Sequence, residues 1–149
     1  MNFFSKFIYP YDRIKAFFLA LMVIVVYIPF LNNPLVFDDF AIFGAAIDHY
    51  ANTWFRLDLR WFPYATFGVT WVFFGEDPPA FRLQNLLLHG MNVLLLLLVL
   101  RVWIKLFIID VSKEKIANWG AWLGALVFAC HPLAVYGVGY LIQRSILIS

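Results

Sequence analysis

The run VLLLLLVL, residues 93–100, decides the fold class of this chain. It lies inside a longer apolar segment, residues 81–109, which exceeds the ~20 residues that an α-helix needs to cross a bilayer. Pro78 and Pro79 precede the segment and mark where a helix begins. We therefore predict a transmembrane helix over residues 81–109.

The composition of the whole chain agrees with a lipid environment. Of 149 residues, 64% are hydrophobic and 13% are charged, and the mean hydropathy is +0.82. A soluble domain is nearer half apolar and a quarter charged, so this chain lacks the polar surface to coat a globule. The net charge of +2 argues against a nucleic-acid partner. The single Cys130 excludes an internal disulfide, and no Cys/His cluster has zinc spacing.

Two further apolar stretches predict two more spans. The first, 13–31, follows a basic flank, but no signal-peptidase site follows it, so we expect an uncleaved helix. The other, 116–148, contains His131-Pro132, where a helix should break or kink. The expected fold is an all-α integral membrane protein with about three spans in a single domain, 1–149.

Basic residues set the expected orientation. Such residues mark the cytoplasmic side. Lys6, Arg13 and Lys15 belong to the N-terminal segment, Lys113 and Lys115 follow the second span, and Arg101 and Lys105 lie near its end. The N-terminus is then cytoplasmic, while the loop 32–80 and His131-Pro132 are extracytoplasmic. Within that loop, apolar residues at 40, 43, 47, 50, 54 and 57 predict an amphipathic interfacial helix over residues 40–57.

The adjacent Asp38 and Asp39, in VFDDF (36–40), have two interpretations. Carboxylates at a membrane surface are expensive unless they are solvated, paired or used. They suit a base or a metal ligand at the mouth of a cavity. Alternatively, one of them caps the helix that begins at Phe40, which composition alone favours.

A polar stripe runs along the second predicted span. Arg82, Asn85, His89 and Asn92 are spaced by 3, 4 and 3 residues, which places them on one helix face. Such groups face protein or a water-filled cavity. A substrate role and hydrogen bonding between helices both explain the stripe.

The stretch HPLAVYGVGYLIQR, residues 131–144, combines a helix break with polar groups. Broken helices at membrane depth line cavities or lie buried in protein. Arg144 either seeks an anion or extends to the membrane interface. Gly120 and Gly124 match a helix-packing motif that is common by chance in apolar sequence.

Four motifs occur in an order that resembles the N-terminal part of the GT-C superfamily of membrane glycosyltransferases. They are LVFDDF (35–40), RWFPYATFGVTWVFFGEDPPAF (60–81), RLQNLLLHGMN (82–92) and FACHPLAVYGVGYLIQRS (128–145). The chain most resembles the tetratricopeptide-containing O-mannosyltransferase-like branch and its bacterial relatives. The likeness covers roughly residues 10–149.

This resemblance implies sugar transfer from a polyprenyl-phosphate carrier to an acceptor outside the cytoplasm, at a bacterial inner membrane. Asp38 or Asp39 would be the catalytic base, or would help to position a divalent metal. A carboxylate suits the first role because the acceptor hydroxyl must lose a proton. By the same resemblance, Arg60, Arg82 and Arg144 would contact the carrier phosphate. Gln143 and His131 would line the same cavity. On the substrate interpretation of the polar stripe, His89 would also bind the substrate.

The chain departs from the family pattern in three ways. Arg82 stands where relatives commonly have His, Tyr136 stands where they often have Glu or Gln, and the enzymes have many more spans. A chain of this length alone is expected to be too short for activity. The alternative is therefore a shortened, non-catalytic relative that serves as an accessory subunit of a respiratory, photosynthetic or pilus-type complex. Expected partners are the lipid bilayer, the polyprenyl-phosphate sugar, and other membrane subunits or the remainder of a longer chain.

Overall fold

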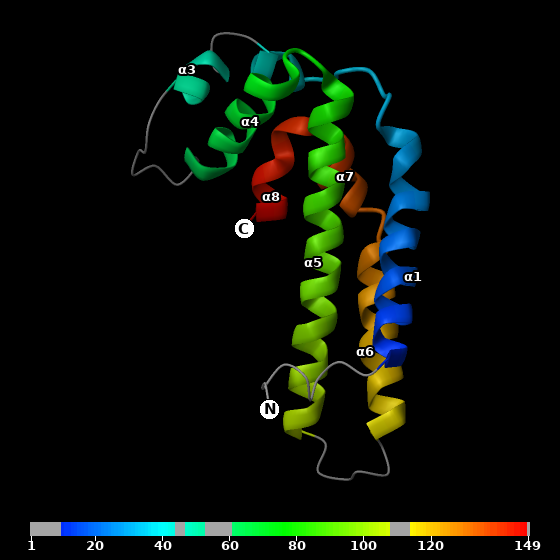
Figure 1. Cartoon of the computed structure of the whole chain (residues 1–149). Coiled ribbons are helices and arrows are strands. Elements are labelled where there is room, and N and C mark those ends of the chain that lie inside the picture. Colours follow the sequence, from blue (N-terminus) through cyan, green and yellow to red (C-terminus); the bar gives the residue numbers. More distant parts are fainter. Residues whose placement is uncertain (1–9, 44–46, 53–60, 108–113, 149) are drawn as a thin grey trace. The chain divides into compact units, whose positions relative to one another are not determined.

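The computed structural model describes residues 10–43, 47–52, 61–107 and 114–148, and within these ranges every regular element is a helix (Figure 1). This confirms the all-α prediction for the described part of the chain. The elements, in chain order, are α1 (Pro10–Tyr27), η2 (Ile28–Phe30), α2 (Asp39–Ala41), α3 (Ile47–Asn52), α4 (Trp61–Phe74), α5 (Pro78–Phe107), α6 (Glu114–Ala129), α7 (Ala134–Gly139), η5 (Leu141–Gln143) and α8 (Arg144–Ile148).

Two of the described helices are long and apolar enough to cross a membrane. One is the 30-residue α5, and the other is α1 with its 3-10 extension, over Arg13–Phe30. Their length and composition suggest a membrane protein and agree with the first two predicted spans. The α-helical part of α1 stops at Tyr27 because Pro29 has no N–H to donate to the preceding turn.

A third span over residues 116–148 is not shown. Helix α6 has 16 residues, fewer than the ~20 needed to cross a bilayer. The chain then turns at 130–133, since Pro132 cannot continue the helix, and three short elements follow. The predicted break at His131-Pro132 is therefore confirmed, and it is a full interruption.

The segment between the two long helices differs from the sequence prediction. Two short helices, α2 and α3, overlap the predicted helix 40–57, while 44–46 and 53–57 lie outside the described residues. Helix α4 was not expected. It has Pro63 in its first turn, where a missing N–H is harmless. It ends at Phe74, just before Gly75, whose φ of 63° is the left-handed conformation that closes helices, and whose N–H donates to the Trp71 carbonyl at 2.8 Å.

The sequence predicts one domain, and the structure divides into two compact units along the chain. Unit 1 comprises Met1–Val26 and Gly90–His131, and unit 2 comprises Tyr27–His89 and Pro132–Ser149. In unit 1, Gly124 lets α6 approach α5 closely, because a Cβ there would meet Leu100 Cδ1 at 3.1 Å.

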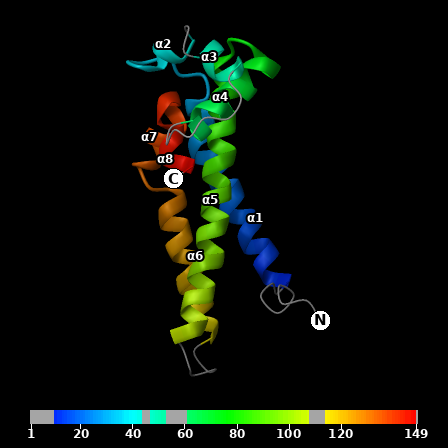
Figure 2. The ribbon, with the colours of Figure 1, turned by 90° about the vertical axis from the view of Figure 1, so that its left-hand side faces the viewer.

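Unit 2 has an apolar core of its own. Its buried members are Ile42, Ile47, Phe67, Phe81 and Leu141. Helices α3 and α4 pack against each other, and α7, η5 and α8 contact one another (Figure 2). The core thus joins the segment after VFDDF to the segment after His131-Pro132.

Candidate functional site

A groove of about 820 Å³ in unit 2 contains Asp38. Its walls come from the segment after η2 and from the segment around α7: Phe30, Asn33, Pro34, Val36, Phe37, Asp38, Pro132, Leu133, Val135, Tyr136, Gly139 and Tyr140. Asp38 is exposed, and its backbone N–H donates to the Tyr140 hydroxyl at 3.4 Å. Among these lining residues Asp38 is the only carboxylate, so it carries the negative charge of the groove.

Phe37, directly before Asp38, has an unusual backbone conformation. Its φ of 48° lies in the left-handed region, which a bulky residue rarely adopts, and its side chain is 85% exposed. Unfavourable backbone conformations cluster at functional sites, where the surrounding structure holds them in place. This outlier is an independent reason to regard the Asp38 turn as a functional feature.

Asp39 has a different environment from its neighbour. It is fully buried, and its Oδ1 accepts the Ile142 N–H at 3.2 Å. Its Oδ2 finds no hydrogen-bond partner among the described residues. Burial raises the pKa of the Asp39 carboxyl, against the hydrogen bond from Ile142 and the charge of Arg82, which lower it. Asp39 therefore fastens the acidic turn to η5 and is shielded from a substrate.

The helix-cap interpretation of the acidic pair needs correction. Asp38 does occupy the N-cap position of α2, but its side chain makes no capping hydrogen bond. Asp39 is the first residue of α2, and its carboxylate accepts from Ile142 instead. Neither aspartate is therefore a side-chain cap of α2.

Arg82 holds the two walls of the groove together. The side chain is 1% exposed, and its donors reach four backbone carbonyls. Nε donates to Gly139 at 3.1 Å, Nη1 donates to Leu31 at 3.0 Å and also to Asn33, and Nη2 donates to Pro34 at 2.9 Å. A planar guanidinium suits such a fan of acceptors. These bonds favour a positioning role for Arg82 over the predicted contact with a carrier phosphate.

Arg144 is likewise engaged inside the protein. It is 0% exposed, so the interpretation of a side chain extending to the membrane interface is wrong. It donates to Asn85 Oδ1 at 2.6 Å, to Thr66 Oγ1 at 3.1 Å and to the Phe81 carbonyl at 3.0 Å. The guanidinium also stacks 3.9 Å from the centroid of Phe67. Arg144 thus links α8 to α4 and α5.

The polar stripe of α5 faces protein. Besides Arg82, the stripe residues Asn85 and His89 are buried, and Asn85 Nδ2 donates to the Gly137 carbonyl at 3.3 Å. His89 packs edge-on against Tyr27, with ring centroids 5.1 Å apart. Of the two explanations of the stripe, the contacts support hydrogen bonding between helices.

The other predicted site residues lie in different surroundings. Gln143 Nε2 donates to the hydroxyl of Tyr136, a groove residue, at 3.5 Å. His131 is exposed and is the last residue of unit 1. Arg60 lies outside the described residues.

The described residues do not fit a protein-built metal site. Across 10–43, 47–52, 61–107 and 114–148, no three His, Cys, Asp or Glu side chains come together. Divalent cations such as Mg²⁺ favour several oxygen ligands, and the lining of the Asp38 groove supplies only one carboxylate.

Sequence reasoning missed the aromatic walls of the groove. Phe37, Tyr136 and Tyr140 line it, and the two tyrosine rings lie 5.4 Å apart. The spacing of Tyr136 and Tyr140, four residues apart after a helix-breaking proline, was the available signal.

No family model, curated protein or solved structure matches this chain.

Proposed function

We propose that this chain is the N-terminal part of a GT-C-type glycosyltransferase, which moves a sugar from a polyprenyl-phosphate carrier to an acceptor hydroxyl on the extracytoplasmic side. The observation that carries the proposal is the exposed carboxylate of Asp38 in an aromatic-lined groove. Of the two aspartates, Asp38 is the base, because Asp39 is buried and bonded to Ile142.

The proposed step is a substitution at the anomeric carbon of the sugar. The acceptor oxygen forms a bond to that carbon while the bond from the carbon to the carrier phosphate oxygen breaks, and the bonding electron pair leaves with the phosphate. Asp38 takes the proton of the acceptor hydroxyl, which is work that a positioned carboxylate does as a general base. The products are the glycoside and the polyprenyl phosphate.

The aromatic walls of the groove could contact the sugar and the prenyl chain of the carrier. The faces of Tyr136, Tyr140 and Phe37 suit the apolar faces of a sugar ring or the first carbons of a prenyl chain. Arg82 and Arg144 donate their hydrogen bonds to protein groups. Of the three predicted phosphate contacts, we therefore assign the carrier phosphate to Arg60. Arg82 acts as a positioning residue that ties residues 31–34, which lead into the Asp38 turn, to Gly139.

The proposed setting is a bacterial inner membrane, with a cytoplasmic N-terminus and an extracytoplasmic segment 32–80. The two long apolar helices support membrane insertion. The basic residues that flank the predicted spans support the orientation.

An accessory subunit of a larger membrane complex is the second candidate function. Helix α4 favours it, since Val69, Val72, Phe73 and Phe74 are 53–76% exposed at its C-terminal end. Such an apolar surface suits a partner helix as well as lipid. Gentle solubilisation followed by native mass measurement separates the candidates: a stoichiometric second subunit supports the accessory role, and a monomer contradicts it.

Aspartate variants of the intact protein test the transferase proposal. We expect Asp38→Asn to reduce transfer from a polyprenyl-phosphate sugar by about 10²–10⁴-fold, the usual contribution of a general base. Glu76→Gln is the matched control, because Glu76 is an exposed carboxylate of the same segment outside the groove lining. Transfer by Asp38→Asn at the rate of the Glu76→Gln control would remove Asp38 from the mechanism.

A further inference from the structure

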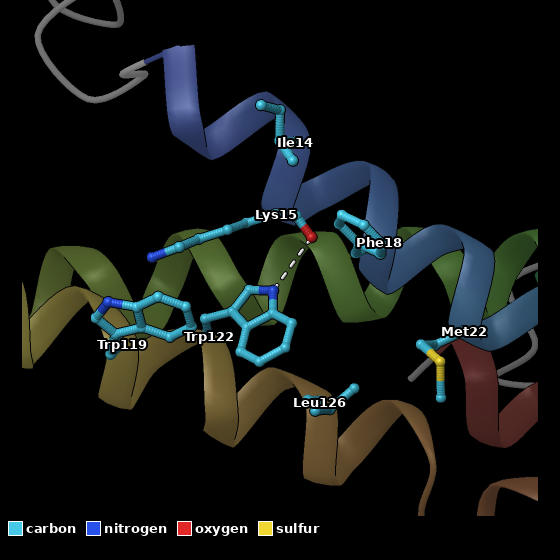
Figure 3. A pocket seen from close by; sticks show the side chains of 7 residues that line it. All are labelled: Ile14, Lys15, Phe18, Met22, Trp119, Trp122 and Leu126. Atoms are coloured by element: carbon cyan, nitrogen blue, oxygen red, sulfur yellow. Dashed lines mark hydrogen bonds between the residues drawn. The ribbon is translucent and has the colours of Figure 1, made fainter.

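A second groove, of about 500 Å³, lies in unit 1 between α1 and α6 (Figure 3). Seven residues line it: Ile14, Lys15, Phe18, Met22, Trp119, Trp122 and Leu126. The two helices are joined at this groove by the Trp122 indole N–H, which donates to the Lys15 carbonyl at 3.2 Å. Apart from Lys15 and the indole nitrogens, the lining is hydrocarbon and thioether.

The groove is polar at one end only. The Lys15 ammonium lies 4.0 Å from the centroid of the Trp119 ring. Figure 3 shows Lys15 reaching toward Trp119, while Met22 and Leu126 lie at the opposite end. No carboxylate belongs to the lining, and the exposed Arg13 lies two residues before Lys15 on α1. A positive end and an apolar remainder match a ligand with an anionic head and a hydrocarbon tail.

We propose that this groove binds one acyl chain of an anionic glycerophospholipid of the bilayer, with its phosphate beside Lys15. Trp and Lys side chains concentrate at the depth of lipid headgroups, where an indole and an ammonium meet both phases. A lysine near an anionic lipid surface gains electrostatic attraction. Phe18 and Met22 offer the tail an adaptable apolar wall. The groove belongs to unit 1, so this site is separate from the Asp38 groove of unit 2.

Competition against a photoactivatable lipid tests the proposal. The intact protein in non-ionic detergent micelles receives trace phosphatidylglycerol with a diazirine on its acyl chain, and peptide mapping locates the label after illumination. We expect label on peptides of α1 and α6. At low salt, unlabelled phosphatidylglycerol should displace it at about fivefold lower concentration than phosphatidylcholine, the preference that one lysine supplies. At 1 M salt the ratio should fall toward one.

Two substitutions isolate the role of the lysine. Lys15→Gln should reduce the ratio to about one, whereas Lys115→Gln should preserve it. Lys115 is a suitable control because it is an exposed lysine of α6 outside the groove lining. Far-UV circular dichroism of both variants checks that helicity is retained. If Lys15→Gln does not fold, the salt dependence of the displacement ratio in the parent protein still tests the proposal. A ratio that stays the same at 1 M salt would contradict an electrostatic contact with the phosphate.

Three outcomes would overturn the proposal. Equal displacement by the two phospholipids at low salt would indicate ordinary annular lipid. A preference that Lys15→Gln retains would place the headgroup elsewhere. Much stronger displacement by unlabelled polyprenyl phosphate would identify the groove as a carrier site, which the proposal does not allow.

Discussion

Replacing Arg82 with Met tests how the acidic turn is held. The substitution removes four hydrogen bonds to carbonyls, of which those of Asn33 and Pro34 belong to exposed residues that water can reach. The carbonyls of Leu31 and Gly139 belong to half-buried residues, so they lose their partner without full replacement. At about 1.5 kcal/mol for each of these two charge-assisted bonds, the turn should lose about 3 kcal/mol of local stability. Arg82→Lys should lose less, since the ammonium keeps the charge but spans fewer acceptors.

Hydrogen exchange resolved to single amides measures this loss. The Asp39 N–H donates to the Val36 carbonyl at 3.0 Å, and the Ile142 N–H donates to Asp39 Oδ1. A loss of about 3 kcal/mol corresponds to roughly 100-fold faster exchange of both amides. Arg13→Met is the control, because Arg13 is an exposed arginine of α1. Unchanged exchange of the Asp39 and Ile142 amides in Arg82→Met would refute the positioning role.

The remaining predictions concern packing and protonation. Gly137→Ala would bring a Cβ to 3.0 Å from Leu147 Cδ2, so we expect it to lower the free energy of unfolding by about 1–3 kcal/mol. A Cβ at Gly120 would meet nothing within 4 Å, so Gly120→Ala should raise the free energy of unfolding by up to about 1 kcal/mol. Denaturant titrations that give the same change for both variants would contradict the close packing of Gly137 against Leu147. Because burial raises the pKa of Asp39 above its ordinary 3.8, the folded state keeps a proton that the unfolded chain has released. The free energy of unfolding should therefore fall as pH rises from that ordinary value through the raised one, and the same slope in Asp39→Asn would show that Asp39 is not its source.

The long helices were readable from sequence because their signals are local. Residues 81–109 form a mostly apolar segment of more than twenty residues preceded by Pro78 and Pro79, and Pro132 cannot continue a helix because it lacks an N–H. Helix α4 was missed because it is apolar on all faces and gave no periodicity. Its local signals were Pro63 in the first turn and Gly75 just past the end.

The roles of the charged residues were harder to read. Asp38 and Asp39 are adjacent and chemically identical, and only the fold separates an exposed groove carboxylate from a buried one bonded to Ile142. Likewise, the residues around an arginine in an apolar stretch do not show which acceptors its guanidinium will bond. Arg82 and Arg144 bond to groups 48–78 residues away in the chain, and such pairings depend on tertiary packing.

Steady-state kinetics of Asp38→Asn test the central claim most directly. A base that acts on the acceptor proton contributes in the transition state, so the variant should lose kcat by about 10²–10⁴-fold with little change in KM for the polyprenyl-phosphate sugar. Asp39→Asn, measured beside it, should retain more activity because Asp39 only fastens the turn to Ile142. A kcat for Asp38→Asn equal to that of the parent protein, or a loss confined to KM, would contradict the assignment of Asp38 as the base.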